Sequence, residues 1–149
     1  RFTQWWLWVI LISFPIMSVG PFDDNEINVY YVLIGLAIPL LFYLFELRIK
    51  VNENGFHYQF FPFHLKFHMI KMDEIESFKA MEYSPLKEYG GWGIKYGFKG
   101  KAYNVSGNKG VKVFLKDGTN IMFGSQKYKK LAKVLKKAGN DKVCLKLEL

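Results

Sequence analysis

Three histidines lie close enough together in the sequence to raise the question of a metal site. His57, His64 and His68 offer imidazole nitrogens, which are common zinc ligands. Alternation along a strand would place His64, Lys66 and His68 on one face. A lysine then separates two of the ligands, and neither a cysteine nor a carboxylate completes the set. We therefore predict exposed histidines on a polar strand face and no metal site.

The rest of the sequence lacks a familiar catalytic motif. The run Gly90-Gly91-Trp92-Gly93 leads into a strand pattern, whereas a phosphate-binding loop needs Lys-Ser/Thr and a helix. Its glycines fit positive φ or close backbone approach beside a packed tryptophan. Ser125 lacks the Gly-x-Ser-x-Gly setting of a hydrolase nucleophile. Asp73 and Glu74 have no histidine or nucleophile at a spacing that is typical of a catalytic site. We expect no catalytic residue, no cofactor and no enzyme activity.

Bases and aromatic residues alternate in one short stretch of the chain. Its members are Lys95, Tyr96, Phe98, Lys99, Lys101 and Tyr103. Anionic lipid attracts bases near its surface by about 1 kcal/mol per charge. Platforms for single-stranded nucleic acid interleave bases with aromatic rings in the same way, and so does an ordinary solvated strand face. We take these six as the candidate lipid-facing residues, keep the solvated face as the alternative and expect no nucleic-acid partner.

Two uncharged apolar stretches near the N-terminus set the expected organisation of the chain. They cover residues 5–22 and 29–45, and each reaches the roughly 17 apolar residues that can cross a bilayer core about 30 Å thick. The sequence therefore predicts a two-helix transmembrane hairpin over residues 1–46 and a separate domain over residues 47–149. The first stretch also resembles a cleaved secretory signal, but Pro21 directly after the cut disfavours cleavage.

Charge is distributed unevenly along the 149 residues, whose net charge is +8. All but one of the 21 Lys and Arg residues follow the second apolar stretch, beginning with Arg48 and Lys50. Bases near membrane ends stay on the cytoplasmic side. We therefore expect an integral, multi-pass protein of the cell membrane whose residues 47–149 lie in the cytoplasm. Because the chain begins with Arg rather than Met, we also expect that upstream sequence is missing.

Strand patterns follow residue 46. The dipeptides Asn54-Gly55 and Asp117-Gly118 favour tight hairpin turns between alternating apolar and polar runs. Residues 64–70 are predicted to form one strand, with Leu65 and Phe67 on the face opposite the histidines.

Helical periodicity follows these strands near the C-terminus. Apolar residues at helical spacing predict an amphipathic helix over residues 126–138, with Ser125 as N-cap and Gly139 just past its end. Its lysines fit a solvated face, although they could also bind lipid or an acidic partner. About seven antiparallel strands capped by such a helix are the order of a pleckstrin-homology-like barrel, an α+β, mainly-β class. The pattern also permits other small α+β folds.

Several short motifs add a resemblance across nearly the whole chain. They are Arg1–Trp6, Val51–Phe56, Met72–Ile75, Glu88–Ile94 and Asp117-Gly118 leading to Ile121–Gln126. With them the chain resembles small bacterial membrane proteins that combine a two-helix hairpin with a bacterial pleckstrin-homology-like domain. That resemblance implies a non-enzymatic role, and no catalytic residue of this chain follows from it.

These observations together predict a non-catalytic, membrane-anchored binding or scaffold module. Its domain would contact anionic lipid headgroups, a protein partner or a second copy of itself at the inner leaflet. The alternative is a structural subunit of a larger membrane complex that is recognised through its hairpin, where small residues such as Gly35 allow close helix approach.

Overall fold

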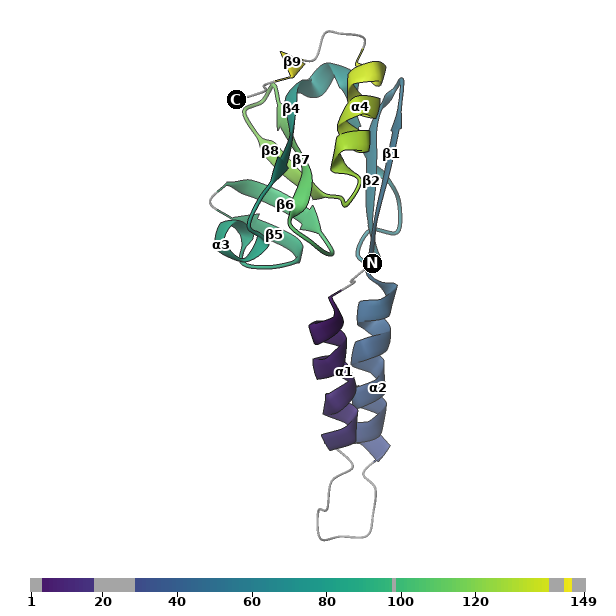
Figure 1. Ribbon diagram of the computed structural model, residues 1–149. Helices are drawn as coiled ribbons and strands as arrows, with labels where there is room; N and C mark the ends of the chain where they lie inside the picture. Colours follow the sequence, from purple (N-terminus) through teal and green to yellow (C-terminus); the bar gives the residue numbers. More distant parts are fainter. Residues whose placement is uncertain (1–3, 18–28, 98, 140–143, 146–149) are drawn as a thin grey trace.

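The computed structural model describes residues 4–17, 29–97, 99–139 and 144–145 (Figure 1). Within these ranges the chain has two N-terminal helices, two β-sheets and a helix after the last long strand. The α+β class and the C-terminal helix are confirmed.

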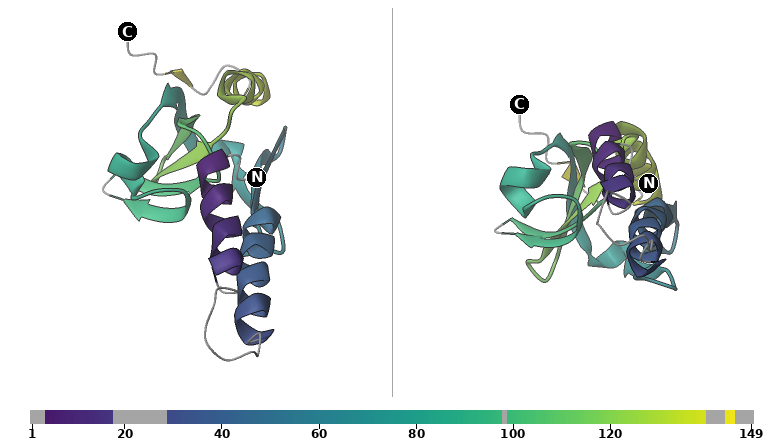
Figure 2. Two further views of the ribbon diagram at one scale, coloured as in Figure 1. Left: turned by 60° about the horizontal axis from the view of Figure 1, so that its bottom comes forward. Right: turned by 90° about the horizontal axis from the view of Figure 1, so that it is seen from below.

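Helices α1 (Trp5–Met17) and α2 (Val29–Leu44) lie side by side and extend away from the sheets (Figures 1 and 2). They contain 13 and 16 residues. At 1.5 Å per residue their lengths are roughly 20 and 24 Å, less than the roughly 30 Å of a bilayer core. Across the described ranges we find no helix that is long and apolar enough to cross a membrane.

This finding corrects every prediction that depended on two membrane spans. The transmembrane hairpin, the integral membrane partnership and the multi-pass cell-membrane localisation were wrong, because the helices of the described residues, 13 and 16 residues long, are too short to cross a bilayer core. Residues 18–22 of the first run and residues 23–28 after it lie outside the described residues.

The smaller sheet consists of β1 (Glu46–Asn52), β2 (Gly55–Phe61) and β3 (His68–Lys71), paired antiparallel in that order. The predicted first hairpin is confirmed, although its turn lies one residue earlier than expected. Asn52 pairs with Gly55 across the turn, and the Gly55 amide donates a hydrogen bond to the Asn52 side chain over 3.0 Å. The asparagine side chain therefore closes the turn.

The larger sheet has the strand order β5-β6-β8-β7-β4, with the two-residue β9 (Cys144–Leu145) beside β4. Its other strands are β4 (Ile75–Glu82), β5 (Gly93–Gly97), β6 (Gly100–Asn104), β7 (Lys109–Leu115) and β8 (Asn120–Gly124). The hairpin at Asp117-Gly118 is confirmed between β7 and β8. A short turn of helix, η1 (Met72–Glu74), enters β4, and α3 (Pro85–Tyr89) follows that strand.

The predicted pleckstrin-homology-like barrel of about seven antiparallel strands is not observed. The order of each sheet runs from one free edge to the other, so neither sheet closes on itself. Strand β6 also pairs with β8 in parallel, which the expectation of antiparallel strands throughout did not include. The chain thus forms two open sheets that share one core.

Helix α4 (Tyr128–Ala138) covers the space between the sheets and contacts β1, β4 and β7 (Figure 1). Its Leu135 is buried in a core that is rich in aromatic rings from both sheets. The helix begins two residues later than predicted, so Lys127 and not Ser125 is its N-cap. Ser125 accepts a hydrogen bond from the Lys127 amide, and the Gly139 amide at the C-cap donates to the Leu135 carbonyl. Removing a buried leucine side chain of this kind costs about 2–5 kcal/mol.

Candidate functional site

The β5–β6 hairpin carries the six predicted lipid-facing residues, and the structure divides them. Tyr96 pairs with Lys101, and Lys95 pairs with Ala102. Neighbouring residues on a strand point to opposite faces, so Lys95 and Tyr96 lie on different faces of β5. Tyr103 is 1% exposed and belongs to the core, so it does not face a ligand. Phe98 lies outside the described residues.

Lys101 and Lys99 have different neighbours. The Lys101 ammonium group lies 5.1 Å from the ring centre of Tyr96 and 4.8 Å from that of Tyr103. The Lys99 ammonium group forms an ion pair with Glu88 of α3 over 3.0 Å. Ala102, opposite Lys95, is buried against residues that include Tyr89 of α3. Lys95 and Lys99 therefore belong to the α3 side, whereas Lys101 and Tyr96 belong to the opposite side.

Residues 62–67, between β2 and β3, form a turn, so only residues 68–70 of the strand predicted over residues 64–70 are observed. The His64 amide donates to the Phe60 carbonyl over 2.8 Å, and the Gln59 side chain donates to the Leu65 carbonyl over 3.0 Å. Because this turn breaks the alternation, the predicted faces were wrong. Leu65 is 78% exposed, Phe67 is also exposed, and His64 is half-buried.

The turn and the β5–β6 hairpin adjoin one another. The His64 ring lies 5.6 Å from the buried Tyr103 ring of β6, edge to face. On the outer side of the turn, Phe63 is 64% exposed, and its ring lies 5.4 Å from that of Phe45, directly after α2. We call this region the loop–hairpin surface; it comprises Lys50, Phe63, His64, Leu65, Lys66, Phe67, His68, Tyr96 and Lys101.

Cations line the apolar part of this surface. The Lys50 ammonium group lies 4.7 Å from the ring centre of Phe67, within cation–π distance. Lys66 is exposed between Leu65 and Phe67 in the turn. Sequence reasoning missed Phe63 and Leu65 as surface residues, because their exposure depends on hydrogen bonds that alternation does not reveal.

Two of the three histidines come together on the loop–hairpin surface. The ring centres of His64 and His68 are 4.3 Å apart, and Tyr58 of β2 stacks on His68 at 5.5 Å. His57 is separate, because it pairs with Met69 and its Nε2 atom lies 3.2 Å from the Asn52 side-chain oxygen. Within the described part of the chain, no group of three or more His, Cys, Asp or Glu residues could hold a metal ion.

The environment of His64 opposes its charged form. Burial lowers the pKa of His64 below its ordinary value, and the nearby His68 and Lys101 groups lower it further. Its Nδ1 atom also accepts a long hydrogen bond, 3.4 Å, from the Phe60 amide. Both effects favour the neutral imidazole, and the hydrogen bond accepted by Nδ1 places its proton on Nε2.

The predicted roles of Trp92 and the neighbouring glycines are confirmed. The Trp92 indole N–H donates to the Gly107 carbonyl over 3.0 Å, and its ring lies 6.1 Å from that of Trp6 in α1. Gly91 has a φ of 121° and Gly93 a φ of 115°, which other residues rarely adopt. This run therefore fixes the backbone and anchors α1 against the larger sheet.

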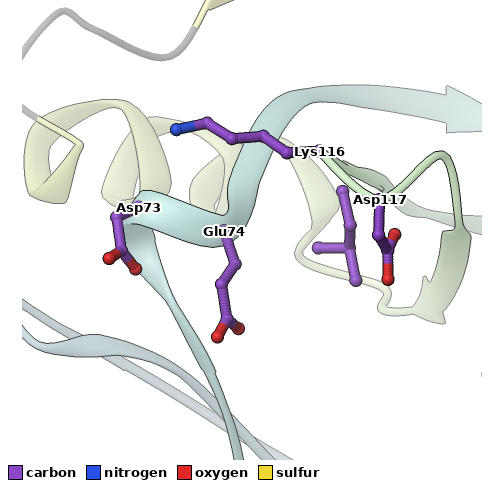
Figure 3. Close-up of a pocket in the computed structure, with 5 residues that line it drawn as sticks. Asp73, Glu74, Lys116 and Asp117 are labelled. Atoms are coloured by element: carbon purple, nitrogen blue, oxygen red, sulfur yellow. The ribbon is translucent and has the colours of Figure 1, made fainter.

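A pocket of about 370 Å³ lies between η1 and the β7–β8 turn (Figure 3). Asp117 accepts hydrogen bonds from the Thr119 hydroxyl and amide over 2.7 and 2.8 Å, and these bonds lower the pKa of its carboxyl group. Glu74 accepts from the Lys71 amide over 3.2 Å. These carboxylates support turns, and the pocket offers no arrangement of acid, base and nucleophile among its lining residues.

Comparisons of the chain with protein-family models, curated proteins and solved structures gave no match. The assignment to bacterial pleckstrin-homology-like membrane proteins was therefore wrong. The motifs behind it are short, and the most specific of them, Glu88–Ile94, is explained by α3 and by the glycine conformations that follow it.

Proposed function

We propose that the protein is a non-catalytic binding module that contacts an anionic lipid surface through the loop–hairpin surface. The observation that carries this proposal is the exposure of Phe63 and Leu65 in the turn that also carries Lys66, with Lys50 against Phe67 of that turn and Lys101 near its His64. Lipid interfaces suit such a mixture, because apolar side chains enter the headgroup boundary while bases remain near the phosphates.

The expected strength of this contact is moderate. Complete burial of one large apolar side chain contributes about 1.5–3 kcal/mol, and each base near an anionic surface adds about 1 kcal/mol. Two partly buried side chains and three bases would give reversible association. That association should weaken as salt screens the charges.

Vesicle co-sedimentation of the whole chain with a charge-reversed variant tests the proposal. Lys50→Glu with Lys66→Glu should weaken binding to vesicles that contain phosphatidylglycerol and leave the fold intact. The matched control is Lys130→Glu with Lys133→Glu, which reverses two exposed charges on α4. Equal loss in both variants would indicate attraction by net charge alone and would contradict the assigned surface.

A second candidate function is that of a subunit recognised through α1 and α2 by an apolar protein partner. The observation that favours it is the number of large apolar side chains that these helices expose: Val9, Ile10, Ile12, Leu33, Ile34, Leu36, Leu40 and Leu41. Large exposed apolar patches commonly mark interaction sites. Leu36→Glu with Leu40→Glu should abolish assembly under this alternative while leaving vesicle binding by the loop–hairpin surface in place.

A further inference from the structure

Three groups that can carry positive charge converge on the loop–hairpin surface. His64 and His68 have ring centres 4.3 Å apart. Lys101 lies 4.8 Å from the ring centre of Tyr103, and that ring lies 5.6 Å from the His64 ring. The three come from the turn, β3 and β6, so the fold and not the local sequence assembles them.

The groups that face His64 from the surrounding elements are neutral or basic. They are Tyr58 from β2, His68 from β3, and Lys101 and Tyr103 from β6. Two imidazole rings 4.3 Å apart and an ammonium group close enough to lower the pKa of His64 repel one another when all are protonated. An anion placed among them would remove that repulsion, and the site would then hold its protons more tightly.

We propose that His64, His68 and Lys101 bind the phosphate of an anionic lipid headgroup, and that the histidine pair takes up a proton as it binds. This inference rests on the proposed function and adds to it the chemical class of the ligand and a dependence on pH. A ring N–H of the histidine pair donates to the phosphate, while the proton that the pair takes up and the Lys101 ammonium group supply positive charge.

The direction of the pH dependence follows from proton linkage. The bound site holds more protons than the free site, so affinity rises as pH falls. Uptake of one proton allows at most a tenfold gain per pH unit. Between about pH 7.5 and about pH 5.5 we expect a gain of roughly tenfold, below this limit.

The experiment is vesicle co-sedimentation of the full chain at these two pH values and constant salt. Phosphatidylcholine vesicles are compared with and without phosphatidylglycerol, whose phosphodiester keeps one negative charge throughout this range. Wild-type protein should bind the anionic vesicles more tightly at the lower pH. His64→Gln with His68→Gln should remove this gain, and Lys101→Gln should weaken binding at both pH values.

Two further variants keep the test specific. His57→Gln is the matched control, because His57 lies outside the site and bonds to Asn52, and its pH-dependent gain should be unchanged. His68→Gln alone alters an exposed ring and leaves His64, with its contact to Tyr103, in place. If the double variant does not fold, loss of the gain in this single variant supports the proposal, and retention contradicts it.

The outcomes separate this inference from the proposed function. Equal wild-type binding at both pH values would overturn the inference and leave the proposed function standing. Failure to bind anionic vesicles at either pH would overturn both. Inorganic phosphate, titrated while the imidazole NMR signals are followed, identifies the source. If inorganic phosphate saturates the site and abolishes vesicle binding, the site recognises the phosphate group of the lipid. Saturation without any effect on vesicle binding overturns the lipid assignment.

Discussion

The two sides of the β5–β6 hairpin carry similar residues in different surroundings. On one side Lys101 lies over Tyr96 and borders the turn that exposes Phe63 and Leu65. On the other side Lys99 is paired with Glu88 of α3. A lysine with apolar and cationic neighbours can meet an anionic surface, whereas a lysine paired with a carboxylate is already neutralised. The neighbours of a lysine, and not its charge alone, therefore decide what it can bind.

Charge reversal on each side should give the largest contrast. Lys101→Glu replaces an attraction to the lipid surface by a repulsion, a change of about 2 kcal/mol or roughly thirtyfold in affinity. Lys95→Glu on the α3 side should change affinity less than about threefold. Vesicle co-sedimentation at low salt measures both, and equal effects would remove the distinction between the two sides.

Apolar truncation should give the next largest contrast. Phe63→Ser should weaken vesicle binding by about 1–2 kcal/mol, because its side chain no longer enters the apolar boundary. Leu86→Ser is the matched control on α3, since Leu86 and Phe63 are both 64% exposed. Both substitutions should leave thermal stability nearly unchanged. A greater loss of binding from Leu86→Ser would contradict the assignment, because it would place the lipid contact on the α3 side of the hairpin.

Releasing Lys99 from its ion pair with Glu88 tests more directly whether the neighbours of a lysine decide what it can bind. Glu88→Gln frees a lysine and raises the net charge by one, yet we expect less than a twofold change in vesicle binding, because the freed Lys99 remains on the α3 side, away from the exposed Phe63 and Leu65. The pKa of Glu88 is lowered chiefly by the hydrogen bond from the Ser84 amide and also by Lys99. Wild-type stability should consequently fall as acid protonates Glu88 below its ordinary pKa, and the variant should lose less over that range. Chemical denaturation at several pH values measures this difference.

The smallest expected effect concerns His64 and folding. Because its pKa is lowered in the folded state, the unfolded chain binds more protons, and stability should decline as pH falls through about 6.5. His64→Gln should flatten this decline by less than about 1 kcal/mol. A steeper decline in the variant than in the wild type would contradict the environment described for His64.

Local signals in the sequence predicted local structure well. The periodicity of residues 126–138 identified α4, because each turn of that helix contacts the core through its own apolar residues. The two hairpin dipeptides also identified their hairpins, since the residues that make those turns are adjacent in sequence.

Features that depend on distant contacts could not be predicted in this way. The parallel pairing of β6 with β8 joins strands that are separated by another hairpin strand, β7. Tyr103 looked like a surface aromatic residue and is a core residue, because both sheets pack around it. The histidine pair likewise depends on the turn at residues 62–67, which alternation alone assigned to a strand.

Amide hydrogen exchange of the full chain, with and without vesicles containing phosphatidylglycerol, would locate the lipid-binding surface. We expect slower exchange at residues 62–69 and near Lys101 when vesicles are present, with unchanged exchange along the lysine-rich face of α4. Protection confined to α4, or to the α3 side of the β5–β6 hairpin, would contradict the assignment of the loop–hairpin surface as the binding site.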